Sequence, residues 1–75
     1  MNNHSLGQMV NEARKAQRLS QMDLQDLSGV SASVIYKIEK GRTDIAFGSL
    51  LAVADALGIE LKAKSPLGQE VRLNG

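Results

Sequence analysis

The segment SQMDLQDLSGVSASVIYKIEKG, which begins at Ser20, constrains the fold of this 75-residue chain more than any other. Ser20 is followed three residues later by Asp23, which is the pattern of a helix N-cap with an acidic first turn. Gly29 can take a positive φ and end that helix, and Ser31 at once offers a second N-cap. The segment therefore predicts two short helices joined by a sharp turn.

The apolar side chains of this segment recur at helical spacing and predict one buried face. The residues expected to point inward are Leu24, Leu27, Val30, Ile35 and Ile38. The opposite face of the second helix carries Ala32, Ser33, Tyr36, Lys37 and Lys40. This polar face suits a helix that enters the major groove of DNA, although a plain helical hairpin in a small bundle shows the same periodicity.

The segment resembles the helix-turn-helix of the Cro/C1-type (Xre) family, and the resemblance extends over roughly residues 5–60. The positions that match the family pattern are Gln21, Leu24, Gly29, Val30, Ile35, Ile38, Glu39 and Gly41. Two positions depart from it, since the family prefers Ala where this chain has Gln25 and an apolar residue where it has Ser28. We expect Gln25 to lean outward along its stem and to alter the helix crossing modestly.

The resemblance implies a mainly α fold, namely a four-helix lambda-repressor-like domain with a short C-terminal β-strand or hairpin. It also implies a structural ion pair, because the Arg and Glu at the places of Arg14 and Glu39 pair in the family. Removing one partner of such a pair is costly when the pair is buried.

Two further helices are expected around this unit. The first covers residues 5–17, with Ser5 and Gln8 in capping-box positions. The other runs from Phe47 to Leu57 and ends at Gly58. The expected division of the chain is a loose tail at 1–4, the helix-turn-helix domain at 5–58 and a dimerising strand or hairpin at 59–75.

The period changes from helical to alternating in the C-terminal segment, which predicts two short strands around a turn at residues 65–68. Two strands are barely stable alone, and a 75-residue chain buries only about 60% of its unfolded surface. We therefore expect the strands to pair across a homodimer. The residues assigned to this dimer strand are Ile59, Leu61, Ala63, Val71 and Leu73.

Four helices followed by LGIELKAKS resemble the HipB-type antitoxins, in which a strand pairs across the dimer. Members of that group repress their own operon and bind a HipA-like kinase toxin. The resemblance therefore implies the antitoxin of a HipBA-like toxin-antitoxin system.

A dimeric regulator of this kind places one recognition helix per subunit into successive major grooves of a palindromic operator, about 34 Å apart. The predicted base-reading residues are Gln21, Ala32, Ser33 and Lys37, of which Lys37 can donate to guanine O6 and N7. The predicted phosphate-binding residues are Ser31, Tyr36, Lys40, Arg42 and Thr43.

Composition limits the other functional classes. Nine Lys and Arg against eight Asp and Glu give a net charge of +1, so bulk charge does not identify a nucleic-acid binder. The local basic face expected instead comprises Arg14, Lys15, Arg18, Lys37, Lys40 and Arg42. The absence of Cys and of an 18-residue apolar run predicts a cytoplasmic chain with no membrane partner.

Catalysis is not expected, because the single histidine, His4, lies in a polar segment and no Gly-rich phosphate loop is present. The sequence likewise predicts no cofactor and no metal site. The competing hypothesis is a protein-interaction subunit whose degenerate helix-turn-helix docks a partner without binding DNA. The small side chains of Ala32 and Ser33 leave that hypothesis open.

Overall fold

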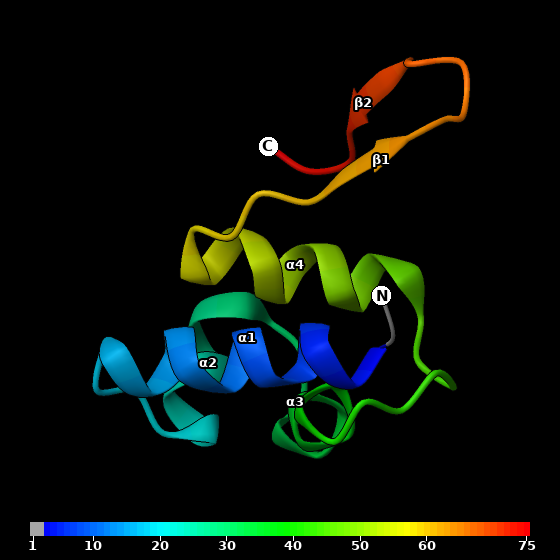
Figure 1. Cartoon of the computed structure of the whole chain (residues 1–75). Helices are drawn as coiled ribbons and strands as arrows, with labels where there is room; N and C mark the ends of the chain where they lie inside the picture. The colour runs from blue at the N-terminus through cyan, green and yellow to red at the C-terminus, as the bar shows by residue number, and fades with distance from the viewer. Residues whose placement is uncertain (1–2) are drawn as a thin grey trace.

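A computed structural model describes residues 3–75 of the chain, with side chains from Ser5 onward. Four helices are followed by a two-stranded antiparallel hairpin (Figure 1), which confirms the predicted fold class. The elements are α1 (Asn3–Ala16), α2 (Gln21–Ser28), α3 (Ala32–Glu39), α4 (Phe47–Leu57), β1 (Lys62–Lys64) and β2 (Glu70–Arg72).

The first helix begins earlier than the sequence predicted. Because α1 starts at Asn3, Ser5 lies inside the helix, and the capping box expected at Ser5 and Gln8 is wrong. Positions 3 and 4, which we assigned to a loose tail, are part of this helix. The same assignment for Met1 and Asn2 lies outside the described residues.

The core lies between the four helices and contains mostly aliphatic side chains. Its buried members are Val10, Leu24, Val30, Ile35, Ile38, Val53, Ala54 and Leu57. The inward direction predicted for Leu27 is wrong, because this side chain is 62% exposed. Viewed down the axis of α2, the fully buried Leu24 marks the centre of the buried face. Ser28 is rotated from Leu24 by about 40° in one direction and Leu27 by about 60° in the other, so Leu27 falls at the edge of that face.

The first strand starts three residues later than predicted. The amide of Ile59 donates to the carbonyl of Ala54 at 2.8 Å and so completes the C-terminal cap of α4 at Gly58, which has φ of 76°. In the hairpin, Lys62 pairs with Arg72, Ala63 with Val71 and Lys64 with Glu70.

One side chain ties the hairpin to the helical body. Asn74 Oδ1 accepts a hydrogen bond from the Leu61 amide at 2.8 Å. Its Nδ2 donates to the carbonyl of Ile59 at 2.8 Å and to Asp55 Oδ1 at 2.9 Å. The hairpin extends away from the helices beyond α4, whereas α3 lies on the opposite side of the molecule (Figure 1).

Candidate nucleic-acid interface

The start of α2 is fixed by a reciprocal capping box. Ser20 Oγ accepts a hydrogen bond from the amide of Asp23 at 2.9 Å, and Asp23 Oδ2 accepts one from the amide of Ser20 at 2.8 Å. The bond from the Ser20 amide lowers the pKa of Asp23, so the carboxylate stays charged at the positive end of the helix. This cap is the one that the Ser-x-x-Asp spacing predicted.

The turn between α2 and α3 also follows the local sequence. Gly29 has φ of 75°, and its amide donates to the carbonyl of Gln25 at 2.8 Å. Ser31 Oγ accepts from the amide of Val34 at 3.2 Å and so caps α3. The predicted glycine turn and second serine cap are both confirmed.

The two residues that depart from the family pattern stabilise this same turn. Gln25 is half-buried, and its Oε1 accepts a hydrogen bond from the Ala32 amide at 2.8 Å. Ser28 Oγ accepts from the Val30 amide at 3.1 Å and donates to the Leu24 carbonyl at 2.7 Å. The expectation that Gln25 leans outward is therefore wrong, since it satisfies an amide at the start of α3 that has no partner within the helix.

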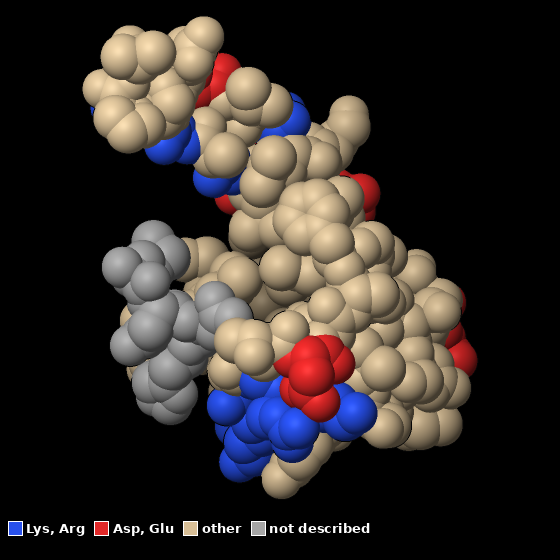
Figure 2. All heavy atoms as spheres, turned by 90° about the vertical axis from the view of Figure 1, so that its right-hand side faces the viewer, with Lys and Arg blue, Asp and Glu red and all other residues tan. Residues whose placement is uncertain are grey.

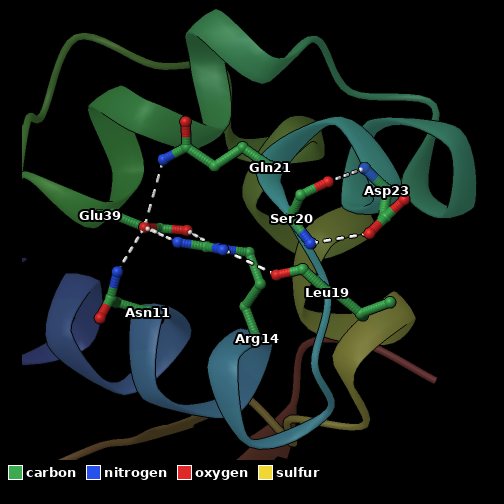
Figure 3. Close-up of polar contacts among 7 residues, drawn as sticks. All are labelled: Asn11, Arg14, Leu19, Ser20, Gln21, Asp23 and Glu39. Atoms are coloured by element: carbon green, nitrogen blue, oxygen red, sulfur yellow. Dashed lines mark hydrogen bonds and ion pairs between the residues drawn. The ribbon is translucent and has the colours of Figure 1, made fainter.

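The other end of α3 is joined to α1 by an ion pair (Figure 3). Arg14 Nε lies 2.7 Å from Glu39 Oε2, and Arg14 Nη2 donates to Glu39 Oε1 at 3.0 Å. A third bond runs from Arg14 Nη1 to the carbonyl of Leu19 at 2.7 Å. The side chains are 10% and 5% exposed, so the structure places together, and largely out of water, the two residues that the resemblance paired.

Glu39 has two further donors in Figure 3. Asn11 Nδ2 donates to Glu39 Oε1 at 2.7 Å and Gln21 Nε2 to the same oxygen at 3.3 Å. Burial acts to raise the pKa of Glu39, but the hydrogen bonds of Arg14 and Asn11, the charge of Arg14 and the bond from Gln21 outweigh it and hold the pKa below its ordinary value. The carboxylate of Glu39 is therefore ionised, and it joins α3 to both α1 and α2.

This network includes one residue that the sequence analysis missed and one that it assigned elsewhere. Asn11 was not singled out, although its spacing of three from Arg14 puts both on one face of α1. Gln21, the first residue of α2, was predicted to read a base; it is half-buried and its side chain contacts Glu39.

Polar side chains of α3 and its C-cap remain accessible. Ser33 and Lys40 are exposed, Tyr36 is 53% exposed, and Ala32 and Lys37 are half-buried. Lys40 Nζ lies 5.4 Å from the centre of the Tyr36 ring, which is a cation–π distance. These residues therefore form one polar surface of α3.

A polar hollow of about 400 Å³ lies between α1 and α3, next to that surface. It is lined by Gln8, Asn11, Arg14, Lys15, Gln21, Tyr36, Glu39 and Lys40. Arg14 and Glu39 offset each other in their ion pair, so Lys15 and Lys40 leave the hollow with a positive charge that can receive an anionic group such as a phosphate. Lys15 belongs to the basic face predicted from the sequence, and the exposed Arg18, also assigned to that face, is in the following turn with φ of 58°.

The loop after α3 carries two more of the predicted phosphate-binding residues, Arg42 and Thr43, and both are exposed. Arg42 Nη2 lies 2.8 Å from Asp44 Oδ2. In Figure 2, Lys and Arg atoms gather at the end of the molecule away from the hairpin, with acidic atoms directly against them. Asp44 was not identified from the sequence.

The described residues contain no cluster of metal ligands and no membrane-spanning helix. No group of three His, Cys, Asp or Glu side chains among residues 5–75 could hold a metal ion. No helix in that range is both long enough and apolar enough to cross a membrane.

The geometry agrees with the family comparison, in which residues 10–63 match the model of a helix-turn-helix family. This chain belongs to the Cro/C1-type helix-turn-helix family. The matched range covers the second half of α1, the whole of α2, α3 and α4, and the beginning of β1.

Two relatives carry regulatory names. The chain is 43% identical over 54 residues to an uncharacterized HTH-type transcriptional regulator, y4dL, of Sinorhizobium fredii, a match that covers 72% of this chain and 28% of the relative. It is 36% identical over 59 residues to the immunity repressor protein of Bacillus phage phi105, covering 79% of this chain and 41% of that protein. The chain therefore spans less than half the length of either relative.

A solved structure supports the same fold. The restriction-modification controller protein C.AhdI from Aeromonas hydrophila is 36% identical in sequence and superposes with a TM-score of 0.68. The match covers 77% of this chain and 88% of that protein. The helix arrangement is thus shared with a controller protein of similar extent.

Proposed function

We propose that this chain is a transcriptional repressor that binds a palindromic operator as a homodimer. The observation that carries the proposal is the polar surface of α3, which is accessible along its length and held at both ends. Its first turn is bonded by Ser31 and Gln25, and Glu39 at its last residue is bonded to Arg14. Base reading needs such a rigid support, because the hydrogen bonds that distinguish bases depend on placement.

Within this surface, Lys37 and Ser33 are the proposed direct base contacts, and Ala32 is the proposed contact to a thymine methyl group. Gln21 is the proposed base contact from the start of α2. The residues around them are proposed to bind phosphates and so to fix the register on the duplex. These phosphate-binding residues are Ser31, Tyr36, Lys40, Arg42 and Thr43.

The hairpin supports the homodimer. Ala63 and Val71 lie opposite each other on the same face of the sheet, and both are exposed, Val71 by 58%. Nearer the body, Leu61 and Leu73 line an apolar groove of about 290 Å³ together with Met9, Phe47 and other residues. A second copy that covers this continuous apolar surface removes it from water and leaves α3, on the far side, free for DNA.

We further propose that the protein is an antitoxin of the HipB type, which represses its own operon and binds a HipA-like kinase toxin. The support is the resemblance of the segment LGIELKAKS after four helices, together with the hairpin that this segment forms. The alternative is a subunit that binds a protein partner and no DNA.

The test is binding to DNA taken from directly upstream of the gene, with a scrambled duplex as competitor and at two salt concentrations. We expect specific, salt-sensitive binding, and we expect Lys37→Ala to weaken it by about 1–3 kcal/mol. Lys64→Ala is the matched control, since it removes the same charge from the exposed hairpin. No preference of the wild-type protein for this DNA favours the protein-interaction alternative, and unchanged binding by Lys37→Ala removes Lys37 from the interface.

Sedimentation tests the dimer separately. A chain ending at Gly58 and a full-length Val71→Lys variant should both sediment as monomers and bind the palindrome more weakly. A stable dimer of the shortened chain refutes the role of the hairpin. The Val71→Lys variant keeps the whole chain, so its result does not depend on how well the shortened protein folds.

A further inference from the structure

The loop between α3 and α4 places an acidic residue within the basic surface proposed to face DNA. Asp44 follows directly after Arg42 and Thr43, two of the proposed phosphate-binding residues. Its Oδ2 lies 2.8 Å from Arg42 Nη2, and the two side chains are 54% and 56% exposed. The pair is therefore open to solvent and to any phosphate that approaches this loop.

The charge of Lys37, on α3, also acts on Asp44. The pKa of Asp44 is lowered first by a hydrogen bond to its own backbone, then by the charge and the hydrogen bond of Arg42, and last by the charge of Lys37. The charge of the carboxylate thus acts on a proposed base contact as well as on a proposed phosphate contact. Figure 2 shows acidic atoms against the cluster of basic atoms at this end of the molecule.

We infer that Asp44 weakens sequence-independent binding to duplex DNA by holding Arg42 in an ion pair and by repelling phosphates. The inference rests on the proposed function. Binding without sequence preference comes almost entirely from cations that neutralise phosphates and release counterions. Asp44 offsets part of the charge of Arg42 and repels an approaching phosphate, so Arg42 contributes less to that process, whereas the proposed base contacts Lys37 and Ser33 are retained.

The consequence concerns competition among DNA sites. A genome offers a regulator a very large number of non-specific sites, so even a modest affinity for any duplex withdraws protein from its operator. An acid within the basic surface lowers that affinity without removing a base contact. The low net charge of +1 has the same direction of effect over the whole chain.

The experiment measures binding of wild type and Asp44→Asn to a random-sequence duplex, by fluorescence anisotropy between 50 and 200 mM salt, a range over which phosphate contacts show large changes in affinity. We expect Asp44→Asn to bind about three- to tenfold more tightly at the lowest salt. The slope of log K against log salt should become more negative by about 0.9, which corresponds to one additional neutralised phosphate.

Two variants show where the effect comes from. Glu70→Gln raises the net charge by the same amount, but it lies on the hairpin, so it should change neither quantity measurably. The double variant Arg42→Ala with Asp44→Asn should lose the gain in slope, because the arginine that Asp44 releases is then missing.

Operator binding is measured in parallel. If wild type prefers the operator but Asp44→Asn changes neither affinity nor slope on the random duplex, the inference is wrong and the proposed function stands. If Asp44→Asn loses operator binding only, Asp44 is a base contact and the inference is again wrong. If wild type shows no preference for the operator, the proposed function fails, and the salt slope on the random duplex still decides the role of Asp44. If wild type binds no duplex at all, the proposed function and the inference about Asp44 are both wrong.

Discussion

The ion pair between α1 and α3 and the ion pairs of the hairpin use the same kinds of side chain in different surroundings. Arg14 and Glu39 are 10% and 5% exposed, and Glu39 receives further hydrogen bonds from Asn11 and Gln21. In the hairpin, Lys62 lies 3.0 Å from Glu60 and 3.2 Å from Glu70, yet these side chains are nearly half exposed. The geometries are similar, but only the first group has given up most of its contact with water.

This difference separates two roles for charge in one small chain. A buried pair holds its segments in one arrangement, because either charge left alone is poorly solvated. An exposed pair competes with water and salt and adds little to stability. We therefore expect the Arg14–Glu39 pair to hold α3 in place. The exposed ion pairs of Lys62 should only keep the surface of the hairpin hydrophilic.

The largest effect is expected for Glu39→Ala. The substitution leaves Arg14 without its counter-ion and removes the acceptor for Asn11 and Gln21, so the free energy of unfolding should fall by about 3–5 kcal/mol. Urea denaturation followed by circular dichroism measures it. Glu39→Gln keeps the size and one acceptor oxygen and should lose less, and a loss for Glu39→Ala as small as that of an exposed pair contradicts the comparison.

An intermediate effect is expected for Gly7→Ala, which tests how tightly α1 packs on the end of α3. A Cβ at Gly7 would lie 2.4 Å from the carbonyl oxygen of Ile38 and 2.9 Å from that of Glu39, so the helices must separate. We expect a loss of about 1–3 kcal/mol in unfolding free energy.

Gly48→Ala is the matched control for that substitution. Gly48 is also inside a helix, but nothing lies within 4 Å of the position of its Cβ. This change should stabilise the protein by up to about 1 kcal/mol through helix propensity. Equal effects of the two substitutions contradict the close approach of α1 to α3.

The smallest effect is expected for Lys62→Ala in the hairpin. Because Lys62 and its partners are exposed, the midpoint of thermal unfolding should not shift measurably at physiological salt. Lys64→Ala serves as the comparison, since the described residues provide no ion-pair partner for Lys64. A clear drop for Lys62→Ala alone shows that the hairpin pairs stabilise the fold.

Local sequence patterns predicted the parts of the interface that depend on neighbouring residues. The caps at Ser20 and Ser31 and the turn at Gly29 involve bonds over three or four residues, so their spacing in the sequence determines them. The Arg14–Glu39 contact joins residues 25 apart. It was accessible only through the family resemblance.

The remaining features depend on packing that one sequence does not reveal. Helical periodicity predicted that Leu27 points inward, but it does not show how far the neighbouring helices cover α2, and they leave Leu27 62% exposed. The role of Gln25 required knowing that the Ala32 amide lies within reach of its side chain. The pairing of Asp44 with Arg42, two residues earlier, could have been inferred from the sequence, whereas the influence of Lys37 on Asp44 depends on how the fold places the loop beside α3.

The hydrogen bonds of Asn74 bear on the spacing between half-sites that the proposed dimer would select. In the proposed dimer the hairpins join the two copies, and Asn74 fixes the direction of each hairpin relative to α4. The separation of the two recognition helices is then set from the opposite end of the molecule. A substitution at Asn74 should therefore change which half-site spacing fits the proposed dimer, while the proposed base contacts to each half-site stay the same.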